Sequence, residues 1–205
     1  MEFLLRPAGK PQRLGILPGS FNPPTRAHLA LAEAALEQVD EVALVLPRTL
    51  PHKIYHGASF AQRVAMLCAT VDRHPRLVAA AADGGLFVEI ARECVRAYGS
   101  GVALDFICGR DAAERVVNWD YGDPDAIARI LSEFSLLVAA RQGEFQPPAC
   151  LADRIRALPM TAEVDDISAS EVRRRIAAGE HWEHLVPAAI VPMVREIYRP
   201  PAYSS

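Results

Sequence analysis

The stretch Gly15-Ile-Leu-Pro-Gly-Ser-Phe-Asn-Pro-Pro-Thr-Arg-Ala-His28 decides the fold expected of this chain. An apolar run leads into Pro18-Gly19, a proline-rich bend follows, and the apolar residues after Thr25 recur with a helical period. The pattern predicts a strand over residues 13–17, a glycine loop, and a helix over residues 26–39. Because the helix begins directly after the loop, successive backbone N–H groups can face one anion there.

His28 falls in the first turn of this predicted helix. Its imidazole then points toward the same place as the free N–H groups and can donate to a phosphoryl oxygen whose charge rises during group transfer. A strand, a glycine loop and a helix also occur in many α/β proteins, so the alternative is an ordinary turn with His28 on the surface.

A second stretch, Val164-Asp-Asp-Ile-Ser-Ala-Ser-Glu-Val-Arg-Arg-Arg-Ile-Ala-Ala-Gly179, marks another helix N-terminus. Ser168 and Glu171 have the spacing of a capping box. Ser170 and Arg173 are also three residues apart, so a hydroxyl and a guanidinium can flank a phosphate beside the helix end. The alternative is a well-capped helix whose arginine run is solvated.

Taken together, Gly-Ser-Phe-Asn-Pro-Pro-Thr-x-x-His and Ile-Ser-x-Ser-x-Val-Arg resemble the nucleotidylyltransferase superfamily, and within it the nicotinate/nicotinamide mononucleotide adenylyltransferases. The resemblance covers roughly residues 14–198. Further landmarks follow in the same order: Leu50-Pro51-His52-Lys53, Ala61-Gln-Arg63-Val-Ala-Met-Leu, Phe106-Ile-Cys-Gly109-Arg-Asp111, Trp119 and Val138-Ala-Ala-Arg141.

One position departs from the superfamily pattern. The usual first motif is His-x-Gly-His, whereas this chain has Thr25-Arg26-Ala27-His28 and keeps only the second histidine. The nicotinamide mononucleotide branch looks similar, with Thr in that place. The choice between nicotinate and nicotinamide therefore stays open. Backbone N–H groups around Asn118-Trp119-Asp120 are candidates to bind the ring substituent; Asp120 would repel a carboxylate if it pointed inward, and Arg110 or Arg115 would attract one.

The composition is that of a soluble globular protein, with 51% hydrophobic and 23% charged residues. A net charge of −3 provides no general surface for nucleic acid or anionic lipid. No segment reaches the ~18 apolar residues of a spanning helix and no targeting signal is seen, so a cytoplasmic protein without a membrane partner is expected. A homo-oligomer stays open.

The cysteines and one histidine pair predict no metal site. Cys68, Cys94, Cys108 and Cys150 are widely spaced, which is typical of reduced core thiols. His181 and His184 could face one side of a helix, but no third ligand accompanies them, so solvated histidines are expected.

Strands alternate with helices along the whole chain, which predicts a doubly wound parallel sheet, the Rossmann-like nucleotidylyltransferase fold that the resemblance implies, with a C-terminal helical appendage. We expect one domain over residues 1–205, with an N-terminal extension (1–12), either an edge strand or loose chain, and a C-terminal helical part (about 165–199) that carries the second phosphate motif. Further strands are expected over 42–46, 77–82, 103–108 and 135–140, and further helices over 59–71, 88–98, 125–134, 151–158 and 187–198.

The residues suit direct in-line displacement, because two helix N-termini, a His, a Lys and an Arg converge on a polyphosphate. No covalent nucleophile or P-loop is seen. The resemblance implies an adenylyltransferase of NAD biosynthesis that joins ATP to nicotinate or nicotinamide mononucleotide and releases pyrophosphate. Two alternatives stay open: an enzyme of the same superfamily with another phosphate-bearing acceptor, and a non-catalytic nucleotide-binding sensor.

Site roles follow from the motifs and the resemblance, with the carboxyl ends of parallel strands as the expected ligand edge. Mg²⁺ would bridge phosphates and water, without a protein cage of its own. The resemblance implies that Trp119 stacks on the pyridine ring; the alternative is simple packing. Lys53 and Asp111 also have alternatives outside the site: Lys53 could lie in an ordinary basic loop, and Asp111 could merely cap a helix. The catalytic candidates are His28, Lys53 and Arg173. The ATP-binding candidates are Gly19, Ser20, Phe21, Thr25, His28, Gly109, Asp111, Ser168, Ser170 and Arg173. The acceptor-binding candidates are Asn22, Lys53, Trp119 and Arg141.

Overall fold

The computed structural model describes residues 1–6, 9–49, 57–118, 122–123, 125–139, 145–160, 164 and 166–199. Its strands are β1 (Glu2–Leu5), β2 (Arg13–Pro18), β3 (Glu41–Pro47), β4 (Leu77–Ala82), β5 (Ala103–Gly109), β6 (Ser135–Ala139) and β7 (Ile155–Leu158). Its helices are α1 (Arg26–Ala35), α2 (Phe60–Val71), α3 (Phe87–Tyr98), α4 (Arg110–Asn118), α5 (Ala126–Glu133), α6 (Ala169–Ala178) and α7 (Val191–Ile197).

Within these described residues, seven strands form one sheet in the order β1-β4-β3-β2-β5-β6-β7. Neighbours pair in parallel except β1, which runs antiparallel to β4 along the sheet edge. The crossover from β4 back to β5, beside β2, places a topological switch point between β2 and β5, where ligands bind in open α/β sheets. The doubly wound sheet expected from the sequence is confirmed, and residues 2–5 of the extension are an edge strand.

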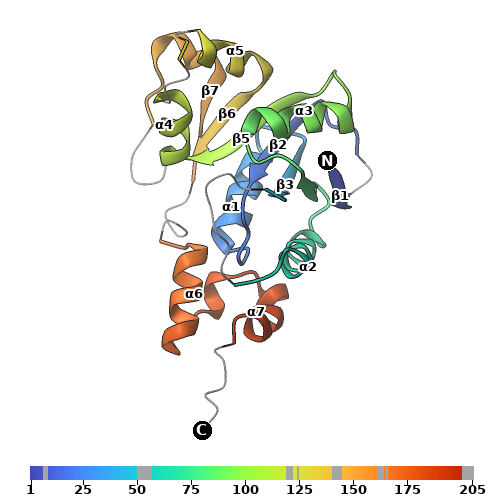
Figure 1. Cartoon of the computed structure of the whole chain (residues 1–205), viewed down its shortest axis with the longest axis vertical. Helices are drawn as coiled ribbons and strands as arrows, with labels where there is room; N and C mark the ends of the chain where they lie inside the picture. The colour runs from blue at the N-terminus through green and yellow to red at the C-terminus, as the bar shows by residue number, and fades with distance from the viewer. Residues whose placement is uncertain are drawn as a thin grey trace.

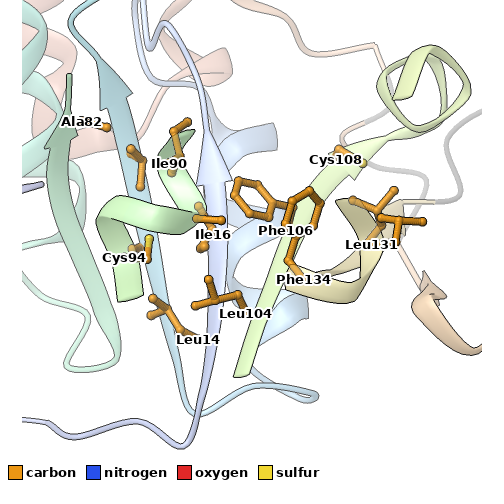
Figure 2. Packing of buried hydrophobic residues seen from close by; sticks show 14 of the residues in the cluster. Leu14, Ile16, Ala82, Ile90, Cys94, Leu104, Phe106, Cys108, Leu131 and Phe134 are labelled. Atoms are coloured by element: carbon orange, nitrogen blue, oxygen red, sulfur yellow. The ribbon is translucent and has the colours of Figure 1, made fainter. Parts of the chain in front are cut away.

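Apolar layers cover both faces of the sheet, and its strands β3 and β4 are therefore buried along their whole length. On one face α3 and α5 contribute to a cluster in which the rings of Phe106 and Phe134 lie with their centroids 4.7 Å apart (Figure 2). Phe87 of α3 stacks on Phe106 with a centroid distance of 4.5 Å. On the other face α1 and α2 pack through residues such as Leu31 and Leu67.

The C-terminal helices form a third cluster against α2. Met66 of α2 packs there with Val172 of α6 and Val194 of α7. Figure 1 shows α6 and α7 together beyond α1 and α2, far from α4 and α5. This packing brings the N-terminus of α6 close to the loop that precedes α1. No helix among the described residues has the length and apolarity that crossing a bilayer requires.

The expected helix over residues 151–158 is wrong. A 3₁₀ helix, Ala149–Arg154, comes first, and Ile155–Leu158 then add a strand to β6. The apolar spacing of Leu151, Ile155 and Leu158 mimics a helical face, but all three residues are buried around the sheet edge instead. Tertiary pairing thus overrides the local period.

Smaller differences concern helix ends and faces. The first helix ends at Ala35 rather than at residue 39, because the chain turns so that the Asp40 carboxylate can accept the backbone N–H groups of Gln12 and Arg13. The last expected helix starts with a 3₁₀ turn, Ala188–Ile190, before α7. The apolar spacing of the helix predicted over residues 88–98 puts Val95 on the inward face, whereas in the structure Val95 is 36% exposed.

Asp105 is a buried carboxylate at the middle of the sheet. Its side chain is 0% exposed and lies 2.7 Å from Arg13 Nη1 and 2.8 Å from Arg156 Nη2. These contacts join β5 to β2 and, across β6, to β7. Two charge-assisted hydrogen bonds offset the cost of removing the carboxylate from water.

We expect Asp105→Asn to lower the free energy of unfolding by about 2 kcal/mol, because two guanidinium groups lose their charged partner while they keep contact with water. Urea denaturation measures the change. Asp123→Asn is the control, since the Asp123 side chain is 45% exposed and also pairs with an arginine. An equal effect of both substitutions would contradict the buried role of Asp105.

Candidate functional site

The loop between β2 and α1 is packed tightly at Gly19. The Gly19 N–H donates to the Val45 carbonyl at 3.0 Å, which holds the loop over β3. A Cβ built on Gly19 would lie 3.0 Å from the ring of Phe21, and Phe21 itself has a φ of 45° and is fully buried. Glycine is therefore needed here for close approach, and Phe21 supports the loop from beneath. The ATP contact expected of Phe21 stays a prediction.

Thr25 and His28 form a capping box at the start of α1. The Thr25 N–H donates to His28 Nδ1 at 3.0 Å, and the Thr25 hydroxyl lies 2.7 Å from the same nitrogen. Since a backbone N–H only donates, Nδ1 is an acceptor and the neutral ring carries its proton on Nε2. Thr25 is 1% exposed, so it holds His28 in place. The direct ATP contact expected of its hydroxyl stays a prediction.

Asn22 joins the loop to three other segments. Its Oδ1 accepts hydrogen bonds from Ala58 N–H, at 3.3 Å, and from the Tyr198 hydroxyl, and its backbone carbonyl accepts one from Arg173 Nη1. The side chain is buried. Its expected role in acceptor binding stays a prediction, whereas these contacts give it a role in holding the loop.

Arg173 brings the two predicted phosphate motifs together. Besides Asn22, its guanidinium donates to the Ala169 carbonyl at 3.2 Å and to the Ser170 hydroxyl at 3.3 Å. The predicted pairing of Ser170 and Arg173 is therefore present. The N-termini of α1 and α6 thus lie on either side of one loop, each with orphan N–H groups and a positive dipole end.

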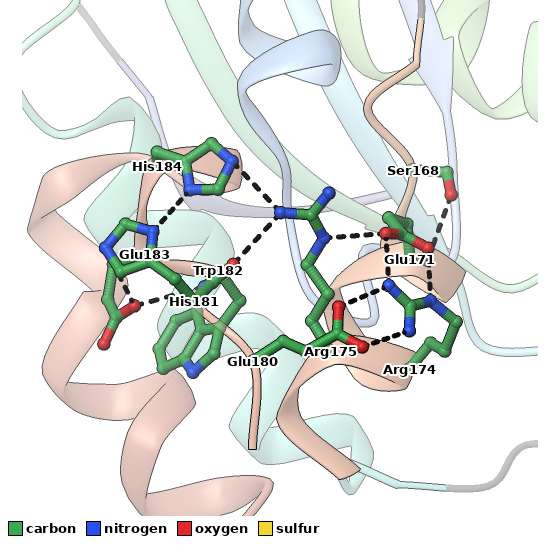
Figure 3. A network of polar contacts seen from close by, with 9 residues as sticks. All are labelled: Ser168, Glu171, Arg174, Arg175, Glu180, His181, Trp182, Glu183 and His184. Carbon is green, nitrogen blue, oxygen red and sulfur yellow. Dashed lines mark hydrogen bonds and ion pairs between the residues drawn. The ribbon is translucent and has the colours of Figure 1, made fainter. Parts of the chain in front are cut away.

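The predicted capping box of α6 is only half formed. The Ser168 hydroxyl accepts the Glu171 N–H at 3.1 Å, but the Glu171 carboxylate turns to Arg174 and Arg175, at 2.8 Å and 2.7 Å (Figure 3). Hydrogen bonds from these two arginines lower the pKa of Glu171 to about 2. The charge of the two arginines is thus matched by glutamates, since Arg174 also pairs with Glu180 at 2.7 Å.

Arg63, which the sequence analysis named as a family landmark without a role, is a buried arginine beneath the loop. It is 4% exposed, and its Nη1 donates to the Ser20 carbonyl at 3.1 Å, beneath the glycine loop. Its guanidinium and that of Arg173 partly offset the rise that burial causes in the pKa of Tyr198. A signal was available, because position 63 lies on the apolar face of the predicted helix over 59–71.

Two hollows adjoin the loop. One, of about 450 Å³, lies at the carboxyl ends of β2 and β3 and extends from Ser20 to the start of α3, to one side of α4 and to α5. Leu86, Phe87 and Phe134 make it largely apolar, and Arg115 lies at its α4 side. The other, of about 530 Å³, is lined mostly by polar and charged residues, and we call it the polar hollow; it lies between Arg26 at the start of α1 and Ser168 at the start of α6.

The remaining predicted residues divide into two groups. Gly109 ends β5 beside β2, and a Cβ there would meet nothing within 4 Å, so this part of the sheet edge is open. Asp111 is exposed in the first turn of α4. The structure brings neither into contact with His28. The other group lies outside the described residues: His52, Lys53, Trp119, Asp120 and Arg141.

The cysteines and the histidine pair offer no second centre. Burial raises the pKa of Cys94 and Cys108 to about 12, which makes both thiols poor nucleophiles. Cys150 is exposed. His181 and His184 stack with their Nδ1 atoms 3.0 Å apart. In the part of the chain that the structure describes, no cluster of three or more His, Cys, Asp or Glu side chains could hold a metal ion.

The sequence matches known proteins over most of its length. Residues 16–175 match the model of the cytidylyltransferase-like family. A probable nicotinate-nucleotide adenylyltransferase of Bordetella avium is 33% identical, over 92% of this chain and 99% of that protein. A protein of the same name from Salinibacter ruber is 31% identical, over 91% and 98%.

Solved structures share the fold. Nicotinic acid mononucleotide adenylyltransferase of Plasmodium falciparum, complexed with NaAD, superposes with a TM-score of 0.70 at 15% identity and covers 91% of this chain and 97% of that one. The same enzyme complexed with APC gives a TM-score of 0.68.

We expect Thr25→Val to lower the free energy of unfolding by about 1 kcal/mol, because α1 loses its N-cap hydroxyl. His28 Nδ1 keeps only one of its two partners, so the imidazole becomes more mobile. Urea denaturation measures the first effect, and ¹⁵N NMR of the ring measures the second.

Thr25→Ser is the matched control, because it keeps the hydroxyl. If Thr25→Val left the His28 ring signals as they are in Thr25→Ser, the positioning role of Thr25 would be wrong.

Proposed function

The chain belongs to the cytidylyltransferase-like family and, within it, to the nicotinate-nucleotide adenylyltransferases; from this premise we propose that it joins ATP to nicotinate mononucleotide and releases pyrophosphate. The observation that carries the proposal is the meeting of two helix N-termini, with His28 on one and Arg173 on the other, across the loop at Asn22. A cytoplasmic location and a part in NAD biosynthesis belong to the same proposal.

In the proposed reaction, a phosphate oxygen of the mononucleotide attacks the α-phosphorus of ATP. The bond from that phosphorus to the oxygen bridging the β-phosphorus breaks, and pyrophosphate leaves with the electron pair. His28 donates through Nε2–H to the α- and β-phosphate oxygens, whose charge rises in the transition state. Arg173 and Ser170 hold the β- and γ-phosphates beside the N-terminus of α6.

The remaining assignments place the rest of both substrates. Gly109 and Asp111 face the adenosine at the open edge of β5, while Ser168 borders the polar hollow. We assign the acceptor's ribose and pyridine ring to the apolar hollow beside Ser20, whose size and lining suit a flat ring. Lys53 and Trp119, with Arg141, stay proposed acceptor contacts on the strength of the family motifs.

Mg²⁺ fits this site as a companion of ATP. The donors around the loop are backbone N–H groups, an imidazole and a guanidinium, which suit phosphate oxygens rather than a cation. Mg²⁺ prefers oxygen ligands and retains several waters, so ATP phosphates and water would supply its coordination. When bound, it neutralises charge on the polyphosphate; the protein's own groups orient the chain of phosphates.

The deciding experiment measures pyrophosphate release from ATP and Mg²⁺ with nicotinate mononucleotide as acceptor. We expect turnover by the wild type and a loss of roughly 10²–10³-fold in kcat for His28→Ala, the scale for removing one charge-stabilising donor. His181→Ala is the control, because this side chain is 75% exposed and lines neither of the two hollows.

No release with nicotinate or nicotinamide mononucleotide, together with turnover of another phosphate-bearing acceptor, would overturn the pyridine-nucleotide assignment. Binding of ATP without turnover of any acceptor would favour a nucleotide sensor.

We expect Arg173→Lys to raise the KM for ATP about tenfold, because an ammonium group cannot make the bidentate contact of a guanidinium. Arg174→Lys is the matched control on the same helix, since Arg174 is bound to Glu171 and Glu180. Initial rates at varied ATP concentration measure both. An unchanged KM for Arg173→Lys would return the residue to a purely structural role.

A further inference from the structure

We propose that Arg115 recognises the ring carboxylate of the acceptor and makes the apolar hollow selective for nicotinate over nicotinamide mononucleotide. The inference rests on the proposed function and assigns its specificity to one side chain. Arg115 lies in the last turn of α4, and among the described residues that line the hollow it is the one that carries a charge.

The hydrogen bonds of Arg115 leave the charged end of its side chain available. Nε donates to the Asp111 carbonyl at 3.1 Å, one helical turn earlier, which steadies the side chain along α4. Within the part of the chain that the structure describes, Nη1 and Nη2 have no hydrogen-bond partner. These two nitrogens form the edge of a guanidinium that binds a carboxylate through two parallel hydrogen bonds.

The chemistry of the acceptor orients it in the hollow. Its phosphate must reach the α-phosphorus of ATP near His28, so it enters at the Ser20 end, next to α1. The pyridine ring is attached to the opposite end of the ribose and therefore extends toward α4 and α5. The ring substituent then comes to the side of the hollow that Arg115 borders.

Arg110, the other arginine expected from the sequence to attract a carboxylate, is engaged elsewhere. Its Nε lies 2.7 Å from the Glu114 carboxylate, and the pair borders a different hollow, of about 380 Å³, together with Phe145. A carboxylate near Arg110 would have to compete with Glu114. The sequence gives Arg110 and Arg115 the same expected role, whereas the structure places them beside different hollows.

The apolar lining strengthens the proposed contact. Leu86, Phe87 and Phe134 displace water from around a bound ring, and an ion pair gains strength as the local dielectric constant falls. The amide of nicotinamide is neutral and gains no such ion pair. It would also leave the guanidinium partly desolvated without a charged partner, so the site rejects it.

The test compares kcat/KM for nicotinate and nicotinamide mononucleotide, with pyrophosphate release as the assay. We expect Arg115→Met to lower the ratio of the two values about tenfold, through a loss with nicotinate mononucleotide alone, while the KM for ATP stays unchanged. Arg115→Glu should lower the ratio further, because it repels the carboxylate. Arg110→Met is the matched comparison, and we expect it to leave the ratio unchanged.

Three outcomes would overturn the inference. The first is an unchanged ratio of the two kcat/KM values in both Arg115 variants. The second is an equal loss of kcat/KM with the two acceptors, which would indicate a merely structural role. The third is a changed ratio in Arg110→Met instead. The proposed function would survive each of these, because the wild type would still use a pyridine mononucleotide. If the wild type used neither acceptor, the proposed function itself would fail, and the role of Arg115 with it.

Discussion

The hydrogen bond from Arg173 to the carbonyl of Asn22 connects parts of the chain that are 151 residues apart, and the arrangement of the site depends on it. Through this contact the N-terminus of α6 faces the loop that begins α1. The apolar cluster of α2, α6 and α7 provides the surface on which this can happen, since it fixes α6 beside α2. The hydrogen bond between Arg173 and Asn22 is thus supported by the hydrophobic packing of α6 and α7 on α2.

Much of the fold was predictable because its signals are local. Continuous apolar runs mark β3 and β4, and Ser59, the first residue of the helix predicted over 59–71, has the side chain of an N-cap and caps α2 in the structure. β7 was not predictable in this way. Residues 155–158 form a strand because they pair with β6, and a short window of sequence gives no information on that pairing. Their apolar spacing fits a helix equally well.

The candidate site was predictable as a set of residue types, and less so as a set of contacts. His28, Ser170 and Arg173 lie where their motifs indicated, at two helix ends that meet. The sequence could not show that the side-chain oxygen of Asn22 accepts hydrogen bonds from Ala58 and Tyr198, because both partners are distant along the chain. For Arg63, the informative feature was a charged residue on the otherwise apolar face of the helix predicted over 59–71, because a buried charge requires a hydrogen-bond partner.

The glycine loop is held by hydrogen bonds from other parts of the protein itself: from Gly19 to β3, from Arg63 to Ser20, and from Arg173 to Asn22. The conformational entropy of this segment is therefore lost when the protein folds, and not again when a ligand arrives. Preorganisation of this kind leaves more of the binding energy for affinity and for the transition state. It also ties recognition to folding, so substitutions beneath the loop that never touch a ligand weaken binding by restoring the segment's freedom.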